Sequence, residues 1–159
     1  MQSNKLEKIV VSVGVGRMRN NPQFEEKVLP EIVKELSLII GQHPATRGAK
    51  KSIAAFKTRE GDTVGLTATL RGKRMRDFLF RLTNIALPRV RDFRGVDTKS
   101  FDARGNLTMG IKEHTVFPEI NPETSKFNFG MEITIVGKTK SKEEGIELSK
   151  TLGVPLKKG

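Results

Sequence analysis

The sequence lacks cysteine and contains only two histidines. Without cysteine the chain can form no disulfide, CxxC redox motif, thiolate zinc site or cysteine nucleophile. His43 and His114 lie far apart in the sequence, and neither has a second histidine three or four residues away. We therefore expect no catalytic metal and no cofactor.

Long apolar runs are also missing. No segment reaches the roughly 18 to 20 apolar residues that a membrane-spanning helix needs, and the N-terminal residues lack the apolar stretch of a signal peptide. The sequence therefore predicts a soluble, cytoplasmic protein with no membrane partner. Because the chain has 159 residues, of which 36% are hydrophobic, we expect a single domain over residues 1–159.

Acidic residues are scarce in the middle of the chain. Lys and Arg number 29 against 18 Asp and Glu, which gives a net charge of +11. Residues 47–104 hold fifteen of these cations but only six acids, and ten of the fifteen are arginine. Arginine can bind a phosphate through two hydrogen bonds and can stack on a base. This concentration indicates a nucleic-acid-binding surface, although the same cations could instead face solvent or pair with acids elsewhere.

Hydrophobic periodicity predicts a mixed fold. Alternating or β-branched residues predict strands over 6–15, 63–70, 107–111 and 131–136, of which the last is apolar enough to be central. Together with three expected helices, this order predicts an α+β fold. It has a largely antiparallel sheet, helices packed mainly on one face, and a long basic hairpin arm at about residues 47–62.

The first helix is expected where apolar residues recur every four positions from Phe24 to Ile40. Asn21 and Pro22 precede it as start signals. Because Pro30 falls inside the pattern and has no N–H, we expect a kink or a helix that restarts there, with Gly41 at its end.

Two further helices follow. Residues 73–87 carry one apolar face, and we expect Asp77 and Arg81 to pair on the opposite face and Pro88 to end the helix. The sequence from Ser141 to Glu144 matches a capping box that opens a last helix through about residue 152. Residues 88–105 have no sustained period and are expected to form an irregular, partly exposed connection.

Motifs for catalysis are weak. Gly14 and Gly16 follow the first strand as in a dinucleotide-binding loop, but the third glycine of that fingerprint would fall at Arg19. The acid pairs at 25–26 and 143–144 lie near helix starts, where they stabilise the helix dipole. A basic enzyme that acts on RNA would need a buried carboxylate pair or an activated histidine, and the sequence offers neither.

The arm has a composition of its own. Residues 50–59 interleave four cations with Phe56 and follow no secondary-structure period. The cations can bind phosphates, small residues such as Ser52 and Ala54 allow close approach, and Phe56 can cover a ribose or stack. The alternative is an exposed hairpin with Phe56 tucked beneath it. Because the chain has no Tyr and no Trp, readout of RNA shape and backbone is favoured over base stacking on the sheet.

Six segments together resemble one known family. They are KLEKIVVSVGVG (5–16), GQHP (41–44), KKSIAAFKTREG (50–61), TLRGKRMRDFLFRLTNIALPRVRDFRG (69–95), KSFDARGN (99–106) and GIKEHTVFPEI (110–120). On these segments the chain is identified as a member of the bacterial ribosomal protein L5 family, which binds 5S rRNA in the large subunit.

The resemblance implies a ribosomal protein with no catalytic role that helps attach 5S rRNA to the large subunit in the central protuberance. In the family, 5S rRNA is bound by polar residues of the first strand, the end of the first long helix and the strand before the Leu-Arg-Gly turn. These positions correspond here to Ser12, Gln42 and Thr69, with Arg17 and Arg71 expected on phosphates.

The resemblance also implies further partners, namely large-subunit rRNA, the P-site tRNA and a protein of the small-subunit head. The bridge to the small-subunit head is placed only loosely, on the exposed later loops. The family loop that reaches the P-site tRNA corresponds to the arm residues Lys50, Lys51, Ser52, Ile53, Ala54, Ala55, Phe56, Lys57, Thr58 and Arg59. A freestanding RNA chaperone, which would bind many RNAs alike, is the competing interpretation.

Four features depart from the family pattern. Members commonly carry a helical extension before the first strand, which we expect to be absent here. The first-strand position is usually Asn rather than Ser12, so a hydrogen bond to RNA is expected to be lost. The arm usually has Gly where this chain has Ala55, and the first helix is usually free of a proline such as Pro30.

Overall fold

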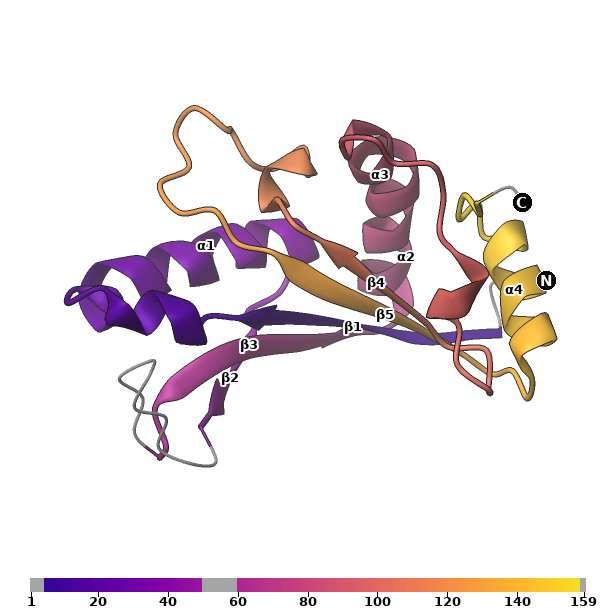
Figure 1. Ribbon diagram of the computed structural model, residues 1–159, viewed down its shortest axis with the longest axis horizontal. Coiled ribbons are helices and arrows are strands. Elements are labelled where there is room, and N and C mark those ends of the chain that lie inside the picture. Colours follow the sequence, from indigo (N-terminus) through magenta and orange to yellow (C-terminus); the bar gives the residue numbers. More distant parts are fainter. Residues whose placement is uncertain (1–4, 50–59, 158–159) are drawn as a thin grey trace.

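The computed structural model describes residues 5–49 and 60–157, and its centre is a five-stranded sheet. The strands lie in the order β2-β3-β1-β5-β4, and every neighbouring pair is antiparallel (Figure 1). Their bounds are β1 Leu6–Gly14, β2 Ala45–Gly48, β3 Thr63–Leu70, β4 Leu107–Ile111 and β5 Met131–Gly137. The predicted α+β fold with an antiparallel sheet is confirmed.

The four predicted strands are all present, and β5 lies inside the sheet as its apolar sequence indicated. β2 pairs with β3, and the pairing continues beyond the strands because the Ala49 N–H donates to the Asp62 carbonyl at 2.7 Å. These two strands flank the segment expected to form the basic arm. Residues 50–59 themselves lie outside the described residues.

Side chains of the three inner strands alternate between two faces of the sheet. In β1 the residues Ile9, Val11 and Val13 are buried, whereas the intervening Val10 and Ser12 are only partly covered. Since consecutive strand residues point to opposite faces, the buried set defines a core face and the other set defines an open face. β3 and β5 follow the same alternation in register with β1.

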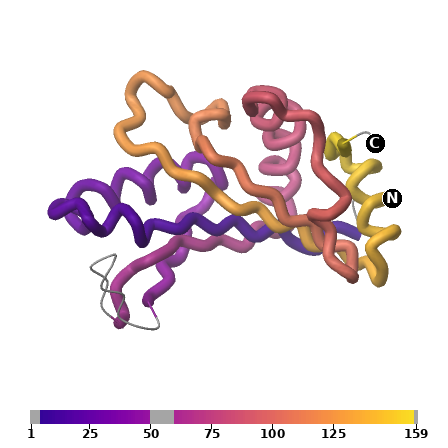
Figure 2. Tube along the Cα trace, viewed as in Figure 1, coloured from indigo at the N-terminus to yellow at the C-terminus, as the bar shows by residue number. Residues whose placement is uncertain are grey.

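Helices cover the core face. α1 (Leu29–Ile40) and α2 (Gly72–Arg81) pack over β3 and β1, and α3 (Leu87–Arg89) extends the α2 helix (Figures 1 and 2). α4 (Lys142–Thr151) packs instead at the end of the sheet, where Leu148 approaches Gly137 at the end of β5. Among the described helices, none lies against the open face.

The first helical region restarts at its proline, as expected. A π-helical segment, Phe24–Val28, comes first, and α1 then begins at Leu29 with Pro30 in its first turn. The helical backbone continues through this junction, and the wider π-helical turn, in which the Leu29 N–H donates to the Phe24 carbonyl, accommodates a residue that has no N–H. Gly41 ends α1 with φ +77°, a left-handed conformation that glycine adopts readily.

The second helix differs from the prediction in two respects. It continues past Pro88 to Arg89, because a π-helical segment, Leu82–Ala86, widens the turn just before the proline. The expected ion pair between Asp77 and Arg81 is wrong. Arg81 instead pairs with Glu119 at 2.8 Å and donates to the carbonyl of Ile39 at 2.7 Å. That carbonyl belongs to the last turn of α1, where helix carbonyls lack partners and attract cations.

A tight turn over residues 102–106, at the end of the irregular connection, packs against the start of α4. Asp102 accepts hydrogen bonds at 2.9 Å from the N–H groups of Arg104 and Asn106. Gly105 has φ +92°, and a Cβ at this position would lie 2.6 Å from the Ser141 carbonyl oxygen. Only glycine therefore fits between this turn and α4. Ser141 caps α4 as predicted, since its hydroxyl accepts from the Glu144 N–H.

A buried polar cluster attaches the segment between β4 and β5 to α1. His114 is fully buried, and its Nε2 lies 3.1 Å from the Ser125 hydroxyl and 3.3 Å from a carboxylate oxygen of Glu35 on α1. The Ser125 hydroxyl also donates to that oxygen at 2.8 Å. Because the Phe129 N–H donates to His114 Nδ1, the hydrogen bonds assign the ring proton to Nε2.

Replacing His114 by leucine is expected to lower the free energy of unfolding by about 1 to 3 kcal/mol, because Glu35 and Ser125 then lose a buried partner. Urea unfolding at neutral pH measures the change. His43→Leu is the matched control, since His43 is the other histidine and is exposed. Equal losses in the two variants would contradict a stabilising role for the cluster.

The turn at Asp102 predicts a pH-dependent contribution to stability. Hydrogen bonds from the backbone N–H groups, that of Asn106 first, hold the pKa of the Asp102 carboxyl below its ordinary value of 3.8. The charged form therefore stabilises the fold above that value, and the contribution is lost as the pH falls through the lowered pKa. We expect Asp102→Asn to lower the melting temperature at about pH 7 and to differ less from the unaltered protein at about pH 3. A difference that grows on acidification would contradict this assignment.

Candidate nucleic-acid interface

The open face of the sheet carries mainly small and hydroxyl-bearing side chains, with the exposed Glu132 beside Ser12 in register. Strand register places Ser12 opposite Thr67, Val10 opposite both Thr69 and Thr134, and Thr108 opposite Thr134. Thr108 and Thr134 bond to each other at 3.2 Å. Within the described residues, the hydroxyls of the other three have no partner. These short side chains let a ligand backbone approach closely and offer it donors and acceptors.

Two of the predicted site residues are in direct contact at one end of this face. The Gln42 amide nitrogen donates to the Thr69 carbonyl at 3.2 Å. Arg74, at the start of α2, approaches the Gln42 amide oxygen at 3.4 Å. Ser12 lies on the same face, because its neighbour in register, Thr67, is two residues from Thr69. The structure thus brings together the three polar residues that the resemblance selected from distant parts of the chain.

Arg17 and Arg71 lie at opposite ends of the face. Arg17 follows the end of β1, near the start of β3, where the Val15 N–H donates to the Val64 carbonyl. Arg71 follows the last residue of β3. At about 3.3 Å per strand residue, roughly 20 Å separates the two positions. A ligand that contacts both must therefore be extended along the sheet.

The sequence did not single out Arg47, Arg74 or Thr67 as members of this face. Arg47 in exposed β2 pairs in register with Gly65 and so projects from the open face, and Arg74 joins Gln42. The signal for Thr67 was available, since the alternation in TVGLTATL places it on the same face as Thr69. Arg47 and Arg74 had no such signal, because their placement depends on the pairing of β2 and the direction of α2.

The cations of the basic middle segment are largely free of ion pairs. Of those described between residues 47 and 104, only Arg81 lies within 4.0 Å of a carboxylate. The others are Arg47, Arg71, Lys73, Arg74, Arg76, Arg89, Arg91, Arg94, Lys99 and Arg104. The interpretation that acids elsewhere neutralise these cations is therefore wrong for the described residues of the segment.

Other arginines have a structural role. Arg19 pairs with Glu25 at 3.0 Å and with Asp62 at 3.2 Å, and its guanidinium lies 4.8 Å from the centre of the Phe24 ring. It also donates to the Thr63 carbonyl. These contacts hold the turn after β1 against the start of β3 and leave little of Arg19 for a ligand.

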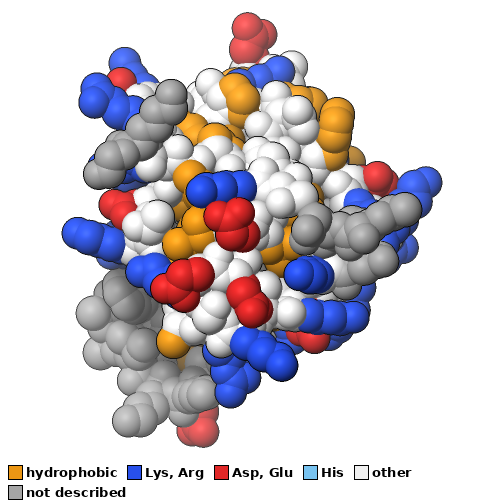
Figure 3. Space-filling view, turned by 90° about the vertical axis from the view of Figure 1, so that its right-hand side faces the viewer, with side chains coloured by type: hydrophobic (Ala, Val, Ile, Leu, Met, Phe, Trp, Pro, Cys, Tyr) orange, Lys and Arg blue, Asp and Glu red, His pale blue; other side chains and the backbone are white. Residues whose placement is uncertain are grey.

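The end of the molecule that carries α4 has a different charge pattern. Figure 3 shows acidic side chains near the middle of this end, with lysines and arginines among and around them. On α4 itself, Lys150 pairs with Glu147 at 3.5 Å. This mixed surface is less suited to a polyanion than the open sheet face and its margins.

The described residues contain no group of three or more side chains of the kinds that hold a metal ion. In the same residues, no helix combines the length and apolar character needed to cross a membrane. The histidine that contacts a carboxylate, His114, is fully buried and forms part of the fold. The predicted arm contacts, Lys50 to Arg59, lie outside the described residues.

Comparison with known proteins matches both halves of the chain to one family. Residues 1–59 match the family model described as ribosomal protein L5, and residues 63–156 match that of the ribosomal L5 family C-terminus. Over 158 residues the chain is 54% identical to the large ribosomal subunit protein uL5 of Oenococcus oeni, which covers 99% of this chain and 86% of that protein. The uL5 protein of Syntrophomonas wolfei is 50% identical over 157 residues, with the same coverage.

Arginines at the two ends of the face predict a measurable salt dependence. Arg47→Gln and Arg71→Gln should each reduce the slope of log affinity for a structured RNA against log salt concentration by about 1, because each removes roughly one phosphate contact. Filter binding over a salt series measures the slope. Lys150→Gln is the control, since Lys150 is exposed on α4 and paired with Glu147. An equal loss of slope in all three variants would contradict a localised interface.

Proposed function

Since the chain belongs to the ribosomal protein L5 family and is a protein of the large ribosomal subunit, we propose that its open sheet face binds 5S rRNA. Like other ribosomal proteins it is a structural constituent of the particle and not an enzyme. Its place is in the cytoplasmic ribosome, among ribosomal RNA.

One observation carries the proposal. Gln42, after the end of α1, contacts both the Thr69 carbonyl of β3 and Arg74 of α2, beside a face of unpartnered hydroxyls. Hydroxyls and amides can bond to the ribose 2′-OH and to phosphate oxygens, and unpaired arginines at the margins can neutralise phosphates. Shape and backbone readout of a folded RNA needs this combination. It does not need aromatic side chains on the strands.

The remaining contacts are proposed from the family resemblance. Residues 1–159 act as one RNA-binding unit, and the arm at about 47–62 reaches the P-site tRNA through Lys50 to Arg59. The exposed later loops meet a protein of the small-subunit head, and the whole contributes to attaching 5S rRNA in the central protuberance. Support for an arm comes from its base, where β2 and β3 pair with all four β2 residues exposed.

Two separable surfaces are expected. The double variant Gln42→Ala with Thr69→Ala should weaken binding of 5S rRNA by roughly tenfold, because two hydrogen-bonding side chains are lost at about 0.5 to 1.5 kcal/mol each. Neutralising Lys50 and Lys51 to Gln should spare that binding and reduce tRNA occupancy in assembled ribosomes. Thr151→Ala is the control, because its hydroxyl bonds within α4, to the Glu147 carbonyl.

Competition binding with 5S rRNA, tRNA and duplex RNA of equal length tests the assignment itself. The proposal predicts a strong preference for 5S rRNA. Equal affinity for the three would favour a general RNA chaperone. If the arm variant lost 5S rRNA binding before the Gln42 and Thr69 variant did, the division between the two surfaces would be wrong.

A further inference from the structure

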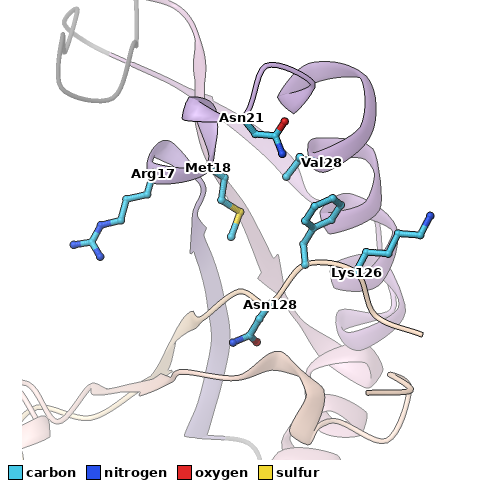
Figure 4. Close-up of a pocket in the computed structure, with 7 residues that line it drawn as sticks. Arg17, Met18, Asn21, Val28, Lys126 and Asn128 are labelled. Carbon is cyan, nitrogen blue, oxygen red and sulfur yellow. The ribbon is translucent and has the colours of Figure 1, made fainter. Parts of the chain in front are cut away.

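A pocket of about 340 Å³ lies at the edge of the sheet where β1 ends and β5 begins. Its walls come from the 3-10 turn after β1 (Gly16–Asn20), the start of the first helical region and the loop before β5. The antiparallel register of Ser12 with Glu132 brings the two segments side by side. The lining residues are Arg17, Met18, Asn21, Val28, Lys126, Phe127 and Asn128 (Figure 4).

The chemistry of the lining favours an anionic ligand with a flat apolar part. The lining includes two cations and no carboxylate, two side-chain amides, and the apolar Met18, Val28 and Phe127. Arg17 and Lys126 extend to opposite sides, and Met18 points into the space between them (Figure 4). The volume lies at the small end of the range for ligand sites, about 300 to 1,000 Å³, and suits one nucleotide rather than a helix.

The amide groups offer both a donor and an acceptor to such a ligand. The Asn21 side-chain oxygen accepts from the Gln23 N–H at 2.9 Å, and its nitrogen has no partner within the described residues. The Asn128 amide faces His114 Nδ1 at 3.3 Å. Because Nδ1 accepts from the Phe129 N–H and carries no proton, the Asn128 amide donates to it through its nitrogen. The Asn21 nitrogen can therefore donate to the edge of a base, and the Asn128 oxygen can accept from it.

We propose that this pocket binds one unstacked nucleotide of 5S rRNA. Its base packs on Phe127 and Met18, accepts a hydrogen bond from Asn21 and donates one to Asn128, while the flanking phosphates contact Arg17 and Lys126. This inference rests on the proposed function and adds a subsite to it. It supplies the aromatic contact that the open face lacks, and unstacked bases bound on aromatic side chains are a frequent mode of RNA recognition.

Both walls of the pocket are held in place without a ligand. In the loop before β5, Ser125 is bonded to Glu35, and Phe129 both donates to His114 and stacks on its ring at 3.9 Å. Residues 126–128 therefore span two anchors. On the other wall, Arg19 fixes the turn through its two ion pairs. Preordered walls reduce the entropy cost of binding a nucleotide.

The central test is Phe127→Leu in the full chain, which removes the ring and keeps an apolar side chain. The affinity for 5S rRNA should fall by about tenfold, as when one base loses an aromatic partner. Phe80→Leu is the control, because Phe80 is an exposed phenylalanine on α2 and takes no part in the pocket. Thermal unfolding of both variants verifies that each folds.

Chemical probing of the RNA gives a second readout. In the complex with the unaltered protein, one unpaired nucleotide should be protected on its base edge. Phe127→Leu should expose that nucleotide and leave the rest of the footprint unchanged. Arg17→Gln and Lys126→Gln should weaken binding and reduce its salt dependence. An unchanged affinity and footprint in Phe127→Leu would overturn the pocket assignment whatever the effect of Arg17→Gln, because Arg17 is also expected to contact a phosphate at the end of the open face.

Two further comparisons distinguish failure of the pocket inference from failure of the proposed function. Titration with free AMP, GMP, CMP and UMP distinguishes an RNA nucleotide from a soluble one, and binding of a free nucleotide as tight as that of 5S rRNA would overturn the proposal. If the Gln42 and Thr69 variant loses 5S rRNA while the pocket variants do not, only the pocket inference fails. If the unaltered protein shows no preference for 5S rRNA, the proposed function fails.

Discussion

The structure depends on a sheet that is covered by helices on one side only. β1 is hydrogen-bonded to β3 on one edge and to β5 on the other, so its register determines which face of the sheet each side chain occupies. Ile9, Val11 and Val13 must enter the core beneath the helices, and every intervening residue must face outward. A shift of one residue in this register would exchange the two sets and expose the core. The binding face is therefore a direct consequence of the period that builds the core.

Two kinds of arginine serve this arrangement in different ways. Arg19 and Arg81 are mostly covered, pair with acids and donate to backbone carbonyls, so they join elements of the fold to each other. Arg47 and Arg71 are exposed and make no ion pair within the described chain. Exposed pairs add little stability in water, so leaving these cations unpaired costs the fold little. It leaves their full charge available to a polyanion.

Sequence patterns predicted most of the strands and helices because these depend on local period and capping. The alternation in β3, the restart at Pro30 and the cap at Ser141 are all readable from neighbours in the chain. The partner of Arg81 could not be predicted in this way. The rule for residues four apart considers only neighbours on one helix, whereas Glu119 and the Ile39 carbonyl lie in other parts of the chain. β2 was equally hidden as a strand of its own, because all its residues are exposed and show no alternation.

The candidate site likewise has a part that could be predicted from the sequence and a part that only the structure shows. Gln42 and Thr69 were selected by resemblance to a family, and their contact is a finding of the structure. The pocket walls are 109 residues apart in sequence at Met18 and Phe127, so no local pattern could join them.

The two family models meet between residues 59 and 63, inside the hairpin of β2 and β3. The sheet nevertheless interleaves the two segments, because β1 from the first lies between β3 and β5 from the second. Ser12 thus gains its neighbours Thr67 and Glu132 only when both segments have folded together. Neither segment can present the open face or the pocket alone, so an RNA that recognises them selects the completely folded chain.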